Sequence, residues 1–338
     1  MDINKEGSGK IKKKLNKMKK IHKDDFDGFL KFKSKDLFNK ISGRSLHNKK
    51  NIQKHKKIKK LILKKKNQEF RNCIVCNSNS NKFLFNKNGF DHVSCKSCKF
   101  VFVNPILKSN IQEKILKKKN TYYKVLNNKT NVKLDNLKFQ YGLQKIKSKS
   151  INKNLLDFGT GYGFFLDNAK KFKWNCYANE LNEDCIKILK KKKFNIDNQL
   201  KSNFYDVVTL WLVLEHIPYP NELFQKIYKS LKKGGKILIN VPNINSLSSL
   251  ILKEKCTMFS GEQHINFFSE LTLKKFLNNN KFKVLSSETV ISDAGTVINY
   301  LNFNNSLEHN NKKIYPFTDP EFMHKNMLGY TLLTIAQK

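Results

Sequence analysis

The sequence predicts an α/β fold with a doubly wound, mainly parallel sheet, preceded by a small four-cysteine module. Three observations lead to this prediction. The strand-like run 154–158 enters a segment with glycine at every second position, and an amphipathic pattern follows it. Apolar runs and helical patterns then alternate as far as residue 290. Two Cys-x-x-Cys pairs lie upstream, between residues 73 and 98.

The length and the net charge of the chain limit the number of domains and the classes of partner. The 338 residues suffice for one α/β domain and an appendage. The formal net charge is +39, of which residues 1–70 carry +17 (24 Lys and Arg against 7 Asp and Glu). Basic charge that is clustered favours a polyanionic partner. Basic charge that is spread over the chain can instead reflect only a lysine-rich surface. Abundant Lys, Asn, Ile and Phe favour the second interpretation, that of a biased composition, and both stay open.

Membrane and secretion signals are not visible in the sequence. No apolar run reaches the roughly 18–20 residues of a membrane helix, and no signal-peptide pattern follows the N-terminus. The chain has seven cysteines, an odd number, and four of them form the two pairs. This usage favours a metal site in a reducing compartment over disulfides. We therefore expect a cytoplasmic protein.

Residues 1–70 form a lysine-rich head. Apolar residues at helical spacing predict helices over 24–42 and 52–66, but their apolar faces are thin. Much of this head is expected to be disordered in isolation. A solvated extension, a segment wrapped on the main domain and a peripheral contact with an anionic membrane surface are the open alternatives.

Residues 71–104 predict a zinc ribbon. Cys73 and Cys76 precede Cys95 and Cys98 by a spacing that suits four thiolates around one structural Zn²⁺. Apolar segments at 83–85, 92–93 and 100–103 supply short strands. A module of this size cannot bury enough core alone, so metal binding would drive its folding. A redox Cys-x-x-Cys is the disfavoured alternative.

The remaining chain divides into a helical segment, 105–150, and the α/β domain, 151–338. We predict helices over 106–118 and 134–146 in the first. In the second, the patterns alternate between strands and helices. The predicted strands are 154–158, 174–179, 204–214, 236–241, 282–290 and 329–336, and the predicted helices after the glycine segment are 182–193, 219–232 and 269–278. Gly234-Gly235 is expected to end the helix before it, and 291–327 is expected to be irregular.

The glycine segment predicts a ligand site at the carboxyl end of the sheet. Gly159, Gly161 and Gly163 allow the backbone to turn and approach a ligand. A dinucleotide fingerprint needs its third glycine one place later, where Phe164 stands. Glu180 ends the next predicted strand, where an acid can bind the hydroxyls of a ribose. No phosphate-loop lysine motif is present.

These features resemble the class I S-adenosylmethionine-dependent methyltransferases. The resemblance lies in the segment 157–163, in Glu180, and in the pairs Glu215-His216 and Gly234-Gly235. It implies a seven-stranded Rossmann-like sheet with an antiparallel final strand, and S-adenosylmethionine as cofactor. Asp157 would orient the methionine end, and Asp197 is a weak candidate for the adenine contact. The predicted cofactor site is completed by Leu181 and Trp211.

The four-cysteine module, followed by Val103-Asn104-Pro105, resembles the zinc module of bacterial sugar and polysaccharide-pathway methyltransferases. This resemblance implies that Tyr122 and Tyr123 belong to a lid. It also implies that His216, His264 and Glu262 face the substrate, with a histidine as base or substrate ligand. The substrate would be an anionic small molecule, a nucleotide-linked sugar or glycan precursor.

Two other functions remain as alternatives. Quinone-ring O-methyltransferases share the Leu-Glu-His-Ile-Pro motif, but an extra acid that some of them carry is replaced here by Leu212. An RNA methyltransferase or a nucleic-acid-binding zinc-ribbon protein would suit the basic charge. Against it, no Asn/Asp-Pro-Pro-Tyr/Phe motif follows the strand 204–214, and the ribbon loop 77–94 has only Lys82 and Lys87 as Lys or Arg residues. Nucleic acid is therefore a disfavoured partner.

Overall fold

The computed structural model describes residues 56–117, 129–146, 153–303, 317 and 319–338. The predicted helix over 24–42, and the predicted lid residues Tyr122 and Tyr123, lie outside these residues. Of the predicted helix over 52–66, the described part is helical at 56–62. Its Ile58 and Ile62 are buried in a cluster with Phe90 of the cysteine module. This part of the head therefore packs on the folded chain.

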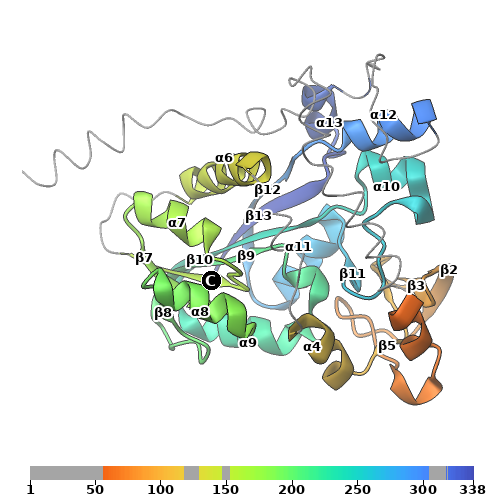
Figure 1. Cartoon of the computed structure of the whole chain (residues 1–338), viewed down its shortest axis with the longest axis horizontal. Coiled ribbons are helices and arrows are strands. Elements are labelled where there is room, and N and C mark those ends of the chain that lie inside the picture. Colours follow the sequence, from red (N-terminus) through yellow and green to blue (C-terminus); the bar gives the residue numbers. More distant parts are fainter. Residues whose placement is uncertain (1–55, 118–128, 147–152, 304–316, 318) are drawn as a thin grey trace, which may run out of the picture.

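The main sheet has the predicted architecture (Figure 1). Its strand order within the described residues is β12-β13-β10-β9-β6-β7-β8. The strands β6 to β10 pair in parallel, and β13 lies antiparallel between β10 and β12. The bounds are β6 (Asn154–Phe158), β7 (Asn175–Asn179), β8 (Asn195–Ile196), β9 (Tyr205–Trp211), β10 (Leu231–Pro242), β12 (Lys283–Val290) and β13 (Thr331–Gln337). The predicted seven-stranded, mainly parallel sheet and its antiparallel final strand are confirmed.

Helices cover both faces of the sheet. Because side chains alternate along a strand, Leu155 and Leu156 of β6 enter different apolar clusters. Leu155 packs with α6 (Lys129–Lys145), α7 (Phe164–Lys171) and α8 (Glu183–Lys191), and Leu156 belongs to the cluster of α9 (Pro220–Ser230) and α11 (Glu270–Asn279). Burial on both faces explains the nearly continuous apolar run of β9.

The cysteine module contributes three strands to a second sheet, and the α/β domain contributes the fourth. These are β2 (Asn81–Lys87), β3 (Phe90–Cys95) and β4 (Val101–Val103), followed at the edge by β11 (Asn266–Phe267). In the register of β11 and β4, Asn266 lies opposite Phe102. Figure 1 shows the module beside β11, so the strand that follows His264 is physically part of the ribbon sheet.

Three local predictions were wrong. The helix predicted over 106–118 begins only at Ser109, as α4 (Ser109–Lys117), because β5 (Ile106–Leu107) pairs with β1 (Gln68–Glu69). Gly234-Gly235 does not end α9. The helix ends at Ser230, and the two glycines lie within β10 where its register with β9 shifts. Gly234 has φ +74°, and a Cβ on Gly235 would approach the carbonyl oxygen of Lys232 to 2.8 Å.

The third error concerns 291–327, which contains two helices in its described part. α12 (Ala294–Phe303) buries Ala294, Val297 and Ile298. It has no charged residue, and its polar residues are Thr296, Asn299 and Asn302, so its polar face is weakly marked in the sequence. α13 (Pro320–Lys325) starts at an Asp319 cap followed by proline, a start signal that the sequence does carry. The structure also contains α10 (Leu247–Leu252), η2 (Lys65–Asn67), η3 (Leu214–His216) and η4 (Lys253–Lys255).

No helix in the described part of the chain has the length and apolarity needed to cross a membrane.

Candidate active site

The glycine segment forms a tight loop between β6 and α7. Gly159, Gly161 and Gly163 have φ of +72°, +57° and +78°, a region that favours glycine. A Cβ on Gly159 would lie 2.6 Å from a methyl of Val213, and one on Gly163 would lie 2.9 Å from a methyl of Leu189. Backbone conformation therefore favours glycine at all three positions, and packing within the protein also requires it at Gly159 and Gly163, beside any approach to a ligand.

Asp157 lies at the carboxyl end of β6. Its side chain is buried, and Oδ1 accepts a hydrogen bond of 2.7 Å from the Thr209 hydroxyl. Burial raises the pKa of Asp157 to about 8, although the Thr209 bond acts in the opposite direction. A group that engaged this carboxylate as a cation or hydrogen-bond donor would favour its ionised form.

Glu180 ends the β7 region and holds the glycine loop. Its Oε2 accepts from the Gly161 amide at 2.7 Å, and its Oε1 accepts from the amides of Leu181 and Asn182 at 2.8 Å each. Since a carboxylate has about four acceptor positions, one remains for a ligand hydroxyl. The Leu181 side chain is 60% exposed.

Trp211 lies where β9 ends. Its ring centroid is 5.0 Å from that of Phe139 in α6 and 5.3 Å from that of Phe165 in α7. The indole N–H is buried and has no hydrogen-bond partner among the residues that the structure describes. Because a buried unpaired donor is costly, Trp211 is a group that a ligand could satisfy.

The Asp197 carboxylate is hydrogen-bonded within the turn that follows it. It accepts from the amides of Gln199, Leu200 and Lys201 and from the Tyr205 hydroxyl. Burial alone would raise the pKa of Asp197, but these hydrogen bonds leave it below its usual value. The side chain thus has a structural role at the predicted position of the adenine contact.

His216 and His264 come together from two loops. Their ring centroids are 4.9 Å apart. Nδ1 of His216 lies 2.9 Å from the Gln263 carbonyl oxygen, and Nδ1 of His264 lies 3.0 Å from that of Met258. Since a carbonyl only accepts, each Nδ1 carries the proton and each Nε2 keeps its lone pair. Burial lowers the pKa of both imidazoles, that of His264 to about 3.

Glu215 completes this cluster. Its carboxyl group is 1% exposed, and neither oxygen has a hydrogen-bond partner within the described residues. Burial raises its pKa to about 8, and Oε1 lies 3.9 Å from Nε2 of His216. One ligand atom from each of Glu215, His216 and His264 lies within 4.8 Å of the other two. Two imidazoles oriented by backbone carbonyls beside a carboxylate could hold a divalent cation.

The sequence indicated the two histidines but not the role of Glu215. Glu262, the predicted assisting acid, is buried two residues before His264. The carboxylate grouped with both imidazoles is that of Glu215. Its signal in the sequence was an acid directly before a histidine at a strand end. Its proximity to His264 could not be predicted, because the two residues are 49 positions apart in the sequence.

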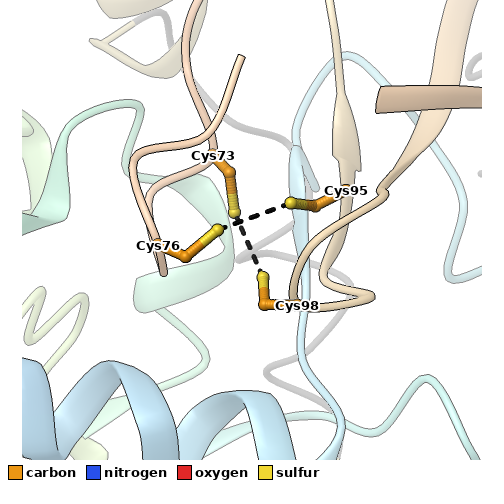
Figure 2. Close-up of side chains that lie close together, drawn as sticks. All are labelled: Cys73, Cys76, Cys95 and Cys98. Atoms are coloured by element: carbon orange, nitrogen blue, oxygen red, sulfur yellow. Dashed lines mark hydrogen bonds between the residues drawn. The ribbon is translucent and has the colours of Figure 1, made fainter. Parts of the chain in front are cut away.

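The four predicted zinc ligands lie together (Figure 2). The Sγ atoms of Cys73 and Cys98 are 3.5 Å apart, and so are those of Cys76 and Cys95. A tetrahedral site with Zn–S bonds of about 2.3 Å places its sulfurs about 3.8 Å apart, close to these separations. The cluster is thus consistent with a zinc ribbon. Cys176, Cys185 and Cys256 are buried elsewhere.

Comparison with known proteins identifies the central region. Residues 134–287 match the family model of a methyltransferase domain. The chain is 28% identical over 130 residues to the ubiquinone biosynthesis O-methyltransferase of Hydrogenovibrio crunogenus, covering 34% of this chain and 51% of the relative. It is 24% identical over 160 residues to the mitochondrial ubiquinone biosynthesis O-methyltransferase of Saccharomyces cerevisiae, covering 40% and 50%. The chain thus spans about half the length of these curated relatives.

Among solved structures, the chain is similar to a SAM-dependent methyltransferase from Archaeoglobus fulgidus, with a TM-score of 0.47 and 22% identity over 65% of this chain and all of that one.

Proposed function

Because residues 134–287 are a class I S-adenosylmethionine-dependent methyltransferase domain, we propose that this chain methylates a small molecule, a nucleotide-linked sugar or glycan precursor. The observation that carries the proposal is the pair of half-buried imidazoles, that of His216 after β9 and that of His264 before β11. Their Nε2 lone pairs lie beside the strand ends at which a doubly wound fold binds its ligands.

The residues of the glycine loop fit the cofactor. Asp157, Glu180 and Trp211 would hold it. The indole N–H of Trp211, which has no hydrogen-bond partner among the described residues, supports this assignment. When bound, S-adenosylmethionine supplies a methyl group on a positively charged sulfur, and its leaving group is neutral. The chain therefore has to position the acceptor and to remove its proton.

The imidazoles can perform this second task. One Nε2 takes the proton of an acceptor O–H, while Nδ1 stays bonded to its backbone carbonyl. The nearby Glu215 carboxylate, once ionised, stabilises the imidazolium that forms. The lowered imidazole pKa values keep both rings unprotonated throughout the neutral range, so that each Nε2 lone pair is available to an acceptor O–H.

The excess positive charge of the chain supports an anionic substrate, since a phosphate-bearing molecule is attracted to a basic protein. Zn²⁺ in the cysteine cluster would have a structural role, because four thiolates leave no open coordination position.

A second candidate is the O-methylation of a ring hydroxyl with a divalent cation at Glu215, His216 and His264. The Glu215 carboxylate, which has no hydrogen-bond partner among the described residues, favours it, and so does the similarity to two ubiquinone biosynthesis O-methyltransferases. A cation held by these three residues would lower the pKa of an acceptor hydroxyl.

One experiment separates the candidates. The full chain is incubated with methyl-labelled S-adenosylmethionine and with nucleotide sugars, catechols or RNA, each with and without a chelator too weak to strip the four-cysteine site. We expect label in a nucleotide sugar, insensitive to the chelator. Chelator-sensitive label in catechols alone would replace the first candidate by the second. Label only in RNA would overturn both.

A further inference from the structure

We infer that Arg71 is a positioning residue, which fixes the loops of His216 and His264 to the four-cysteine module. The inference rests on the proposed function, because it assumes that these histidines serve methyl transfer. The Arg71 guanidinium bonds to backbone carbonyls of the two loops and to the Asn266 side chain, so its effect on the imidazoles is transmitted through the loops.

The Arg71 guanidinium donates its hydrogen bonds to uncharged acceptors. Arg71 is 6% exposed. Nη1 donates to the Pro218 carbonyl at 2.8 Å, and Nη2 donates to the Ile265 carbonyl at 2.8 Å and to Oδ1 of Asn266 at 2.9 Å. Burial lowers the pKa of Arg71 to about 10, so the guanidinium stays charged at neutral pH. A buried charge of this kind requires its acceptors to stay in place.

These acceptors belong to the two histidine loops. Pro218 lies two residues after His216, and Ile265 directly follows His264. The loops are also bonded to each other, since the Ile265 amide donates to the Glu215 carbonyl at 2.9 Å. The planar fork of Arg71 spans both loops at once, a geometry that a single ammonium group cannot reproduce.

Asn266 extends the same connection. Its Nδ2 donates to the carbonyls of Leu214 and Ile217, at 3.2 and 2.7 Å, while its Oδ1 accepts from Arg71. The η3 turn that carries Glu215 and His216 is thus enclosed by hydrogen bonds that lead back to Arg71.

The other end of Arg71 belongs to the cysteine module. Arg71 precedes Cys73 by two residues. Its amide donates to Oδ1 of Asn104 at 3.1 Å, and Nδ2 of Asn104 returns a bond of 3.2 Å to the Arg71 carbonyl. The guanidinium carbon lies 5.4 Å from the centroid of the Phe102 ring in β4. An ordered module therefore fixes the position of the guanidinium. The guanidinium in turn fixes the positions of the loops that carry His216 and His264.

An open cavity of about 610 Å³ lies beside this contact, and Arg71, Asn104 and Tyr219 are among its lining residues. When Arg71 is shortened to alanine, a small guanidinium ion can enter from solvent and occupy the vacated position. This access makes chemical rescue a direct test of the role of the guanidinium.

The test uses the full zinc-loaded chain and its Arg71→Ala variant. Nitrogen-15 spectra of the histidine rings report which ring nitrogen carries the proton and require no acceptor substrate. We expect Arg71→Ala to retain its zinc and its S-adenosylmethionine affinity, but to lose the uniform Nδ1–H state of His216 and His264. Added methylguanidinium should restore that state.

Once an acceptor substrate is identified, kcat for methyl transfer should fall on the order of 100-fold in Arg71→Ala. The affinity for the cofactor should change less than about twofold. Lys232→Ala is the control, because it removes a cation paired with Asp206 away from the histidine loops. Should Arg71→Ala not fold, Arg71→Lys replaces it, and the same loss of the ring signature is expected.

A folded, zinc-loaded Arg71 variant with unchanged ring tautomers would overturn the inference, and so would a loss that methylguanidinium fails to reverse in Arg71→Ala. Failure of the proposed function has a different signature, since the ring spectra would respond to Arg71 even if no acceptor were methylated.

Discussion

Nδ1 of His216 lies 2.9 Å from the carbonyl oxygen of Gln263, and this contact joins the end of β9 to the loop that carries His264. It fixes the tautomer of His216, and the ring centroids of the two imidazoles lie 4.9 Å apart. The two histidine segments of the sequence therefore form one site.

Replacing His264 should slow methyl transfer without weakening cofactor binding. The change His264→Gln removes an Nε2 lone pair, and loss of a general base typically costs 10²- to 10⁴-fold in rate, so we expect a fall in kcat of about that size. Steady-state kinetics with the identified acceptor check this.

The control is His324→Gln, because His324 is a buried histidine whose Nδ1 is hydrogen-bonded to the Thr289 hydroxyl. It should leave kcat per folded molecule unchanged. An unaltered kcat in His264→Gln would remove that residue from the reaction.

The stability of the ligand-free protein should fall between pH 6.5 and 8. The pKa of Asp157 is about 8 in the folded chain and about 4 when unfolded, so the folded state binds the extra proton in this window. Stability present at low pH is then lost as the pH rises toward 8, at up to about 1.4 kcal/mol per pH unit for this group. The histidines, whose pKa values are lowered, act in the opposite direction only below about pH 6.5.

Urea unfolding of wild type and Asp157→Asn at several pH values measures this slope. The variant should show a flatter dependence over the same window, while Asp184→Asn, at the start of α8, should keep the wild-type slope. Equal slopes in wild type and Asp157→Asn would contradict the assigned pKa.

Zinc should depend on the four clustered cysteines and not on the others. Cys95→Ser should lose the metal and disorder residues 71–104, because the module has too little core to fold without it. Cys185→Ser, which changes a buried cysteine in α8, should keep one zinc per chain. Elemental analysis of the purified proteins decides the matter, and metal-free wild-type protein with an ordered module would refute the prediction.

The sequence was most informative where burial imposes a period. Apart from the short β8, α10 and β11, the strands and helices between 154 and 290 follow apolar patterns that burial on both faces of a parallel sheet imposes, so their order could be predicted. The four cysteines were equally predictable, because metal geometry restricts their spacing.

Tertiary pairing explains what was missed. The strand β11 has two residues and exists because Asn266 and Phe267 pair with β4, so no local period announces it. Arg71 is a single basic residue in a chain full of lysines, and only the fold brings Pro218 and Ile265 to it. The grouping of Glu215 with His264 likewise depends on two loops that are distant in the sequence.

Titration of S-adenosylmethionine into the full chain tests the proposed methyl-donor site most directly. We predict saturable one-to-one binding that S-adenosylhomocysteine competes away. Glu180→Gln should weaken it by about tenfold or more, since the change disturbs a charge-assisted bond to the Gly161 amide, whereas His264→Gln should bind as wild type does. No saturable binding, or binding that is indifferent to Glu180, would contradict the assignment.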